Sequence, residues 1–213
     1  SPEPTPEPDW ADGLVTEVEI KRAIVAAHGG PIAPKVVEFQ CRRLLASREI
    51  EGTIARIEAA GGRAVYRSVD VRDAAALRPV LVDARKHLGP IRGVVHAAGV
   101  LADRLIEDKT DEQFAEVWST KVDGARALLD ATRDDELAAL AFFSSSTARF
   151  GRKGQIDYAA ANEALNKLAQ REARRRTTCR VVSVNWGPWD GGMVTPGLKK
   201  LFAAEGVGVI GLT

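Results

Sequence analysis

The sequence predicts an α/β fold built on a doubly wound parallel sheet. Apolar segments of strand length alternate along the chain with segments that have the periodicity of amphipathic helices. Residues 137–143 are almost entirely apolar, as expected for a strand that is covered on both faces of a parallel sheet. With 213 residues, 45% of them hydrophobic, the chain is long and apolar enough to form one domain of ordinary size.

The composition excludes several classes of function. A net charge of +1 provides no electrostatic footprint for nucleic acid or an anionic membrane. No apolar run approaches the roughly 20 residues of a membrane span, and the first residues lack the features of a signal peptide. Two cysteines, Cys41 and Cys179, suit a reducing compartment, and the three scattered histidines offer no metal site. We therefore expect a cytoplasmic protein with no nucleic-acid, membrane or metal partner.

The first element is a linker followed by a helix. Residues 1–13 begin with four prolines that alternate with serine, glutamate and threonine, which favours an extended linker without a packed core. Thr16 and Glu19 have the spacing of a capping box, so we expect a helix from this point to His28. The glycine pair that follows His28 ends that helix.

The next helical segment begins at Pro34, a residue that is favourable in the first turn of a helix. Ser47 is a candidate cap for a continuation over residues 49–60, which the glycines at 61–62 end. We assign residues 14–62 to a helical insert and a connecting helix.

Residues 63–213 are expected to form the catalytic part of the domain. Alternating valines in residues 64–71 indicate a strand, and Thr110 with Gln113 forms a second capping box. The elements expected in this part are strands at residues 64–71, 91–95, 137–143 and 180–186, and helices at residues 74–88, 111–131 and 158–175.

Polar side chains follow the apolar strand at residues 137–143. Ser145 lies at its carboxyl end, which is where ligands bind in open α/β sheets. Tyr158 and Asn162 are four residues apart, so they share one face of the next helix. A phenol with a pKa near 10 is a poor acid at neutral pH unless a cation is close, and Lys121 on the preceding helix is the candidate cation.

The set of Ser145, Tyr158, Asn162 and Lys121 resembles the short-chain dehydrogenase/reductase superfamily, whose usual signature is Tyr-x-x-x-Lys. Here Asn162 occupies the lysine position, and the lysine lies in Thr-Lys-Val-Asp-Gly on the earlier helix. That exchange marks the ketoreductase domains of modular polyketide and polyunsaturated-fatty-acid synthases, and it disfavours a free-standing reductase of small carbonyl compounds. The spacings among the four residues match this family.

The resemblance implies a Rossmann-like fold and a reaction. Such domains use NADPH to reduce a 3-oxoacyl group carried on an acyl carrier protein, within a synthase that holds other catalytic domains. By resemblance, Tyr158 protonates the developing alkoxide, Ser145 binds the carbonyl oxygen, and Lys121 lowers the phenol pKa and holds the cofactor ribose. Asn162 orders the lysine or a relayed water.

The resemblance also implies cofactor contacts. Besides Lys121 and Tyr158, the matching positions are Asp70, Val71, Ala97, Ala98, Gly99, Gly187, Pro188 and Trp189. Taken alone, each segment has a simpler explanation: Asp70 as the cap of a turn, and the Gly-Pro-Trp segment as a turn with a packed tryptophan. The preference for NADPH over NADH comes from the family alone.

Three residues correspond to positions that control the substrate and the product configuration. Asp103 is the second aspartate of the Leu-Asp-Asp fingerprint of B-type ketoreductases, with Ala102 in place of the first. Phe150 stands where the opposite type has tryptophan, and Met193 lies in a candidate lid. These residues favour B-type reduction to a D-configured 3-hydroxyl, and the simpler explanation of Asp103 is an exposed loop residue.

One expected element of the fold is not in this sequence. No glycine-rich phosphate loop precedes residue 64, because the glycine pair at 29–30 ends a helix instead of following a strand. We therefore expect the sheet to be incomplete in its N-terminal half, with the missing half supplied by the same polypeptide or another chain. The alternative is a non-catalytic structural or docking domain that has lost cofactor binding, which a titration with NADPH would distinguish.

Overall fold

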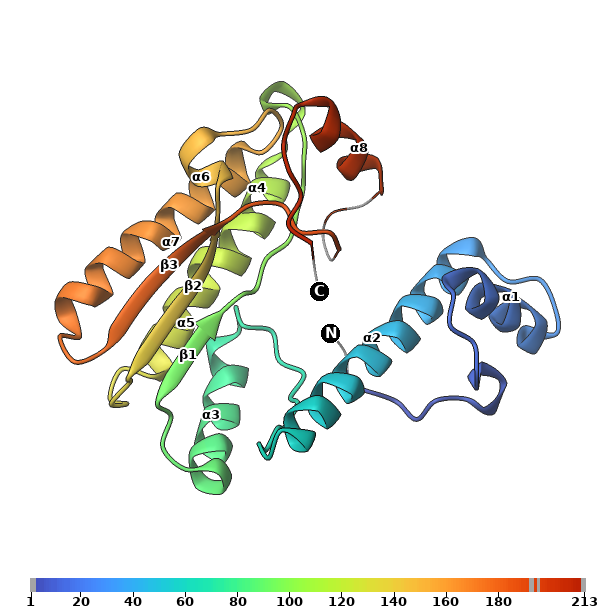
Figure 1. The fold of residues 1–213 in the computed structure, drawn as a ribbon, viewed down its shortest axis with the longest axis horizontal. Helices are drawn as coiled ribbons and strands as arrows, with labels where there is room; N and C mark the ends of the chain where they lie inside the picture. Colours follow the sequence, from blue (N-terminus) through green and yellow to red (C-terminus); the bar gives the residue numbers. More distant parts are fainter. Residues whose placement is uncertain (1–2, 192–193, 195, 212–213) are drawn as a thin grey trace. The chain divides into compact units, whose positions relative to one another are not determined.

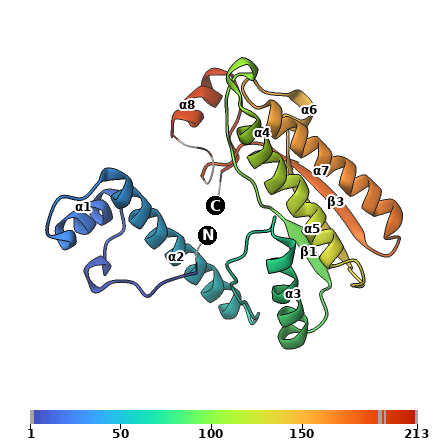
Figure 2. The same cartoon turned by 180° about the vertical axis from the view of Figure 1, so that it is seen from behind.

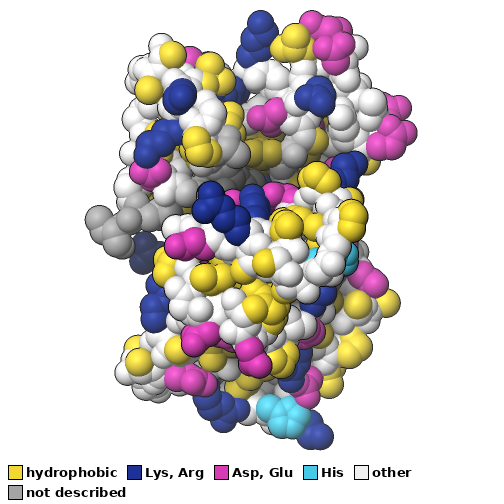
Figure 3. Space-filling model, turned by 90° about the vertical axis from the view of Figure 1, so that its right-hand side faces the viewer, with side chains coloured by type: hydrophobic (Ala, Val, Ile, Leu, Met, Phe, Trp, Pro, Cys, Tyr) yellow, Lys and Arg dark blue, Asp and Glu magenta, His cyan; other side chains and the backbone are white. Residues whose placement is uncertain are grey.

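The computed structural model describes residues 3–191, 194 and 196–211. The chain divides between Ser68 and Val69 into two compact units. No helix among the described residues is both long and apolar enough to cross a membrane. Basic and acidic side chains are interspersed over the face shown in Figure 3.

The N-terminal unit is a pair of helices. Helices α1 (Glu17–His28) and α2 (Pro34–Ala59) lie side by side (Figures 1 and 2) and share a core. The capping box that the sequence predicts at Thr16 is present, since its hydroxyl accepts a hydrogen bond from the backbone N–H of Glu19. The buried core residues of this unit are Ala11, Ile20, Ile24, Val37, Cys41 and Leu44.

Two sequence expectations for this unit differ from the structure. The segment from residue 34 to residue 59 is one continuous helix, so Ser47 is a buried residue inside α2 and not an N-cap. Within the segment expected to be an extended linker, Asp9–Ala11 forms a 3-10 turn whose alanine is fully buried. Arg48 on α2 holds this turn by donating to the carbonyl oxygens of Ala11 and Leu14.

The C-terminal unit contains a parallel sheet of three strands in the order β1-β2-β3: Gly93–His96, Ala139–Ser145 and Arg180–Trp186. Figure 1 shows the strands side by side, and Figure 2 shows α4, α5 and α7 in front of them. The helical elements are α3 (Ala74–Leu88), a 3-10 turn (Ile106–Asp108), α4 (Asp111–Trp118), a π turn (Ser119–Asp123), α5 (Gly124–Ala131), α6 (Thr147–Phe150), α7 (Ile156–Arg175) and α8 (Pro196–Ala204).

The two faces of the sheet are covered unequally. Leu140 and Phe142 of β2 are buried in a core that includes Leu165 of α7. Alternate residues on the opposite face remain accessible: Val95 of β1 is 63% exposed and Val182 of β3 is 37% exposed. The parallel α/β class and the incomplete sheet that the sequence predicts are confirmed.

The strand expected at residues 64–71 does not form. The alternating valines there suit a strand, yet Val65 is 51% exposed, and no strand of the described chain pairs with this segment. A strand is stabilised by hydrogen bonds and side-chain pairs across its neighbours, so a suitable pattern without a neighbour stays irregular.

Candidate active site

The site lies beyond the carboxyl end of β2, where side chains from three separate elements meet. Ser145 is the last residue of β2, Tyr158 lies in the first turn of α7, and Lys121 lies in the π turn between α4 and α5. The Lys121 Nζ atom is 5.2 Å from the centre of the Tyr158 ring. The structure thus brings together three residues that are far apart in the sequence.

Lys121 is held in place by its buried surroundings. Its ammonium donates to the carbonyl oxygen of Phe143 over 3.1 Å, and its side chain is almost inaccessible to solvent. Burial disfavours the charged form and lowers the pKa of Lys121 to about 8. The ammonium form therefore predominates at neutral pH and is lost a little above it.

The π turn that carries Lys121 packs closely against β1. The Nε2 atom of buried His96 lies 2.8 Å from the carbonyl oxygen of Lys121, and burial lowers the pKa of this imidazole to about 4. His96 is therefore neutral at physiological pH. Its contact with the Lys121 carbonyl gives it a structural and not a catalytic role.

Gly124, at the end of the π turn, is in close contact with Val71. A Cβ atom at Gly124 would lie 2.7 Å from the Val71 side chain, so only glycine allows this approach. The helix expected over residues 111–131 is interrupted by this π turn. Single π turns within α-helices occur frequently at functional sites.

Tyr158 is surrounded by the other predicted catalytic residues. Burial raises the pKa of its phenol, while the neighbouring side chains of Asn162 and Ser145 act in the opposite direction. The negative charge of Asp103 adds to the rise. The phenol is therefore protonated at neutral pH, which is the form that an acid requires.

Asn162 is fully buried and has one unused acceptor. Its Nδ2 atom donates to the carbonyl oxygen of Tyr158 over 2.8 Å, and its own backbone carbonyl accepts from Ser144 Oγ over 3.0 Å. Its Oδ1 atom has no hydrogen-bond partner among the described residues. Such an atom fits a water, an ammonium or a ligand hydroxyl as its partner.

The predicted cofactor residues fall into three groups. Asp70 is exposed and paired with Arg72 over 2.7 Å, which lowers the pKa of its carboxyl group, so its observed contacts match the simpler explanation of a turn. Ala97, Ala98 and Gly99 follow β1 in a loop of small side chains. Gly187, Pro188 and Trp189 follow β3.

An aromatic cluster adjoins the third group. The ring centres of Trp186 and Trp189 are 4.9 Å apart, and Phe143 packs against both. Both indole N–H groups are buried and lack acceptors among the described residues. Unpartnered donors beside small residues fit a ligand that carries hydroxyl and amide groups, as a nicotinamide cofactor does.

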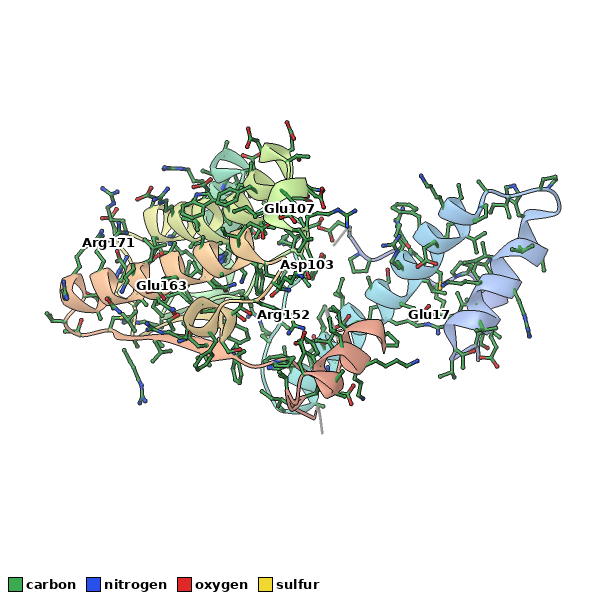
Figure 4. All side chains as sticks on the ribbon, turned by 90° about the horizontal axis from the view of Figure 1, so that it is seen from above. Glu17, Asp103, Glu107, Arg152, Glu163 and Arg171 are labelled. Atoms are coloured by element: carbon green, nitrogen blue, oxygen red, sulfur yellow. The ribbon has the colours of Figure 1, made fainter. Side chains whose placement is uncertain are left out.

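The predicted stereocontrol residues do not all meet. Asp103 lies at the α7 end of the site, where Gln155 donates to its Oδ2 over 2.9 Å and its Oδ1 is buried without a partner in the described chain. Phe150 is 87% exposed, so it is not part of the buried site. Met193 lies outside the described residues. Figure 4 shows Asp103 and Arg152 at one end of α7 and Arg171 at the other.

Sequence reasoning missed a buried ion pair beside the tyrosine. Lys109 Nζ lies 2.7 Å from Asp157 Oδ2, with both side chains almost fully buried. An aspartate in the first turn of a helix was visible in the sequence and is favourable there because of the helix dipole. Nothing in the sequence points to Lys109, because its partner is distant along the chain.

This arrangement defines a class of protein. A parallel α/β sheet whose carboxyl end holds a serine, a phenol and a buried lysine is the architecture of a Rossmann-like, short-chain dehydrogenase/reductase fold. The KR domain family profile matches residues 34–191. The chain therefore belongs to the ketoreductase (KR) domain family, whose members are oxidoreductases that bind a nicotinamide cofactor.

Known proteins agree with this assignment. The chain is 41% identical to part of the polyunsaturated fatty acid synthase of Thraustochytrium sp., over 96% of this chain but only 8% of that protein. It resembles the ketoreductase of the first module of phoslactomycin biosynthesis in Streptomyces sp. HK803 at 37% identity and a TM-score of 0.68, covering 78% and 37% of the two chains. A structure of A-type ketoreductases from a modular polyketide synthase matches at 34% identity and a TM-score of 0.68, covering 79% and 34%.

Proposed function

We propose that this domain uses NADPH to reduce a 3-oxoacyl group on an acyl carrier protein to the 3-hydroxyacyl group, within a polyketide or fatty-acid synthase. The observation that carries the proposal is that Lys121, Ser145 and Asn162 all lie around Tyr158: the Lys121 ammonium is 5.2 Å from its ring centre, Asn162 donates to its carbonyl oxygen, and Ser145 and Asn162 both influence the pKa of its phenol. The names of the related synthases support the substrate class.

The residues present fit the cofactor. Its nicotinamide and ribose would be held by Lys121 and Tyr158, by the small residues at 97–99 and by the segment at 187–189. When bound, the cofactor supplies a hydride to the carbonyl carbon. Asp70 and Val71 would flank the site. Asp70 forms an ion pair with Arg72, and Val71 packs against Gly124.

The side chains of this chain handle the oxygen and the proton. Ser145 donates a hydrogen bond to the carbonyl oxygen, a contact that strengthens as negative charge grows there. As the C=O π electrons move onto that oxygen, the Tyr158 hydroxyl gives it the proton that completes the alcohol. The phenolate left behind is stabilised by the nearby Lys121 ammonium. Asn162 Oδ1 accepts a hydrogen bond from the lysine or from a water that returns the proton.

We extend the proposal to the product and the partners. The retained Asp103 and the presence of Phe150 where the opposite type has tryptophan favour B-type reduction to a D-configured 3-hydroxyl. Similarity in fold does not decide this point, since an A-type structure is equally similar. The exposed Val95 on the edge strand favours completion of the sheet by a further segment of the synthase, with the cytoplasm as the expected compartment.

The test uses the complete polypeptide that contains this domain. Calorimetric titration with NADPH, followed by NADPH consumption in the presence of a 3-oxoacyl thioester, is expected to show both binding and turnover. A polypeptide that binds no NADPH and consumes none would contradict the proposal and favour a structural domain. Consumption by a Tyr158→Phe variant at the wild-type rate would exclude the assigned acid.

A further inference from the structure

A buried charge pair connects the loop after β1 to the catalytic helix, and the proposed reaction does not use it. Lys109 and Asp157 form this pair over 2.7 Å, with side chains that are 4% and 1% exposed. The second carboxylate oxygen of Asp157 accepts the backbone N–H of Tyr158 over 2.9 Å. One carboxylate therefore links the Lys109 ammonium directly to the main chain of the catalytic tyrosine.

The same ammonium also holds the loop that carries Asp103. Lys109 Nζ donates to the carbonyl oxygen of Ala102 over 2.7 Å. Two further hydrogen bonds fasten the segment at 102–104 to the residues just before Tyr158: Arg104 N–H to the Gly154 carbonyl at 3.0 Å, and Gln155 Nε2 to Asp103 Oδ2 at 2.9 Å. Lys109 thus bridges the Asp103 loop and the start of the helix that carries Tyr158.

Packing alone does not require a charge pair at this position. Removing two charges from water is costly, and apolar residues of similar volume often stabilise a core equally well or better. An ion pair that also hydrogen-bonds backbone groups does fix the relative orientation of the segments it joins, because each of its hydrogen bonds is short and charge-assisted. The pair therefore suits a role in geometry more than a role in stability.

We propose that Lys109 is a positioning residue, which acts through Asp157 and the Ala102 carbonyl to fix the Tyr158 phenol relative to the Asp103 loop. The proposal rests on the proposed ketone reduction for its kinetic consequence. Fixing these two segments together determines how the ketone is presented to the phenol, and therefore both the rate and the configuration of the new alcohol.

Substitutions in the complete polypeptide test this role. Lys109→Met removes the charge at similar volume and leaves Asp157 buried without its partner, so both stability and kcat are expected to fall. In the double variant Lys109→Met with Asp157→Asn, no unpaired charge remains and stability is expected to recover. In this double variant kcat should stay about 10- to 100-fold below wild type, because a displacement of the phenol by about 1 Å is enough for such a loss.

Two further readouts separate positioning from simple stabilisation. The KM for NADPH should stay close to the wild-type value in the double variant, while the ratio of the two 3-hydroxy enantiomers shifts toward equality. The matched control is Lys167→Met, which removes an exposed partner of Glu163 on the same helix and should change none of these quantities. A double variant with wild-type kcat and enantiomer ratio would overturn the proposal.

Failure of the proposed function has a separate signature. If the wild-type polypeptide reduces no ketone, hydrogen exchange decides the question without activity. Peptides that contain the Tyr158 amide and the 102–109 loop are expected to exchange faster in Lys109→Met and in the double variant than in wild type. Unchanged exchange in both variants would show that Lys109 positions nothing.

Discussion

The two ends of the three-stranded sheet differ in whether every buried polar side-chain atom has a partner among the described residues. Where the strands begin, Arg85 forms two hydrogen bonds with the Asp135 carboxylate, at 2.9 and 2.6 Å. Arg176 donates to the carbonyl oxygens of Thr132 and Asp135 and to the fully buried Glu172. These charges are matched by partners within the chain.

At the carboxyl ends of the strands, hydrogen-bonding capacity is left unused. The four buried side-chain atoms that lack a partner among the described residues all lie at this end: Asp103 Oδ1, Asn162 Oδ1, Trp186 Nε1 and Trp189 Nε1. An unpaired buried polar atom costs free energy, so proteins rarely retain several together without a use for them. One end of the sheet is therefore arranged for stability, and the other keeps donors and acceptors available for a ligand.

The largest expected effect is the loss of the phenol. In Tyr158→Phe, kcat should fall by about 10² to 10⁴, the range for a single acid–base group, while NADPH affinity stays close to wild type. Steady-state kinetics and calorimetry on the complete polypeptide measure the two quantities. The other tyrosine of this chain provides the matched control, since Tyr66→Phe should leave kcat unchanged.

At the end where the strands begin, a substitution should lower stability and leave kcat unchanged. Arg176→Met leaves two carbonyl acceptors and the Glu172 carboxylate with fewer partners, which should lower the local stability of α5 and α7 by about 2 kcal/mol. Native-state hydrogen exchange measures this loss, and kcat at low temperature should remain at the wild-type level. A variant that keeps its stability and loses activity would show that the two ends are not separate in function.

The exposed pair of Arg133 with Asp130 provides the control for that experiment. Both side chains are more than half exposed, so Arg133→Met should leave stability close to the wild-type value.

A pH dependence follows from the buried lysine. Because burial lowers the pKa of Lys121 to about 8, the ammonium loses its proton as the pH rises through that value. The proposed scheme requires the cation beside the phenol, so kcat should be level below this pH and fall by about tenfold per unit above it. Lys121→Met should show a lower rate without this limb, whereas an unchanged limb in the variant would assign it to another group.

The smallest effect concerns the charge of Asp103. Its carboxylate raises the pKa of the Tyr158 phenol, so Asp103→Asn should make the phenol a slightly stronger acid. The amide oxygen can still accept from Gln155, which preserves the contact with the start of α7. We expect kcat at neutral pH to rise by roughly two- to threefold, and a fall would mean that the carboxylate itself contacts the substrate.

Local patterns in the sequence predicted much of this structure. The capping boxes at Thr16 and Thr110 are present, and the helix at 74–88 and the strand at 180–186 have the expected bounds. These elements depend on neighbouring residues, so their signals are contained in short stretches of sequence. The spacing of Ser145 and Tyr158 was also informative, because strand and helix geometry fix where such residues lie.

Features that depend on distant partners were not predictable. The segment at 64–71 has a strand pattern but finds no strand to pair with, and no local signal reports that lack. The π turn around Lys121 and the Lys109–Asp157 pair arise from packing between elements that are far apart in the sequence. The assignment of Asp103 and Phe150 to one stereocontrol group came from the family pattern, and only Asp103 faces the site in the structure.

The most direct test of the central claim is a mass measurement on the substrate itself. A 3-oxoacyl group loaded on its carrier protein is incubated with NADPH and the complete wild-type polypeptide, and the acylated prosthetic arm is weighed by mass spectrometry. We predict a product that is heavier by two hydrogen atoms, with the new hydroxyl at the third carbon. An acyl group of unchanged mass, recovered from a polypeptide that demonstrably binds NADPH, would contradict the account.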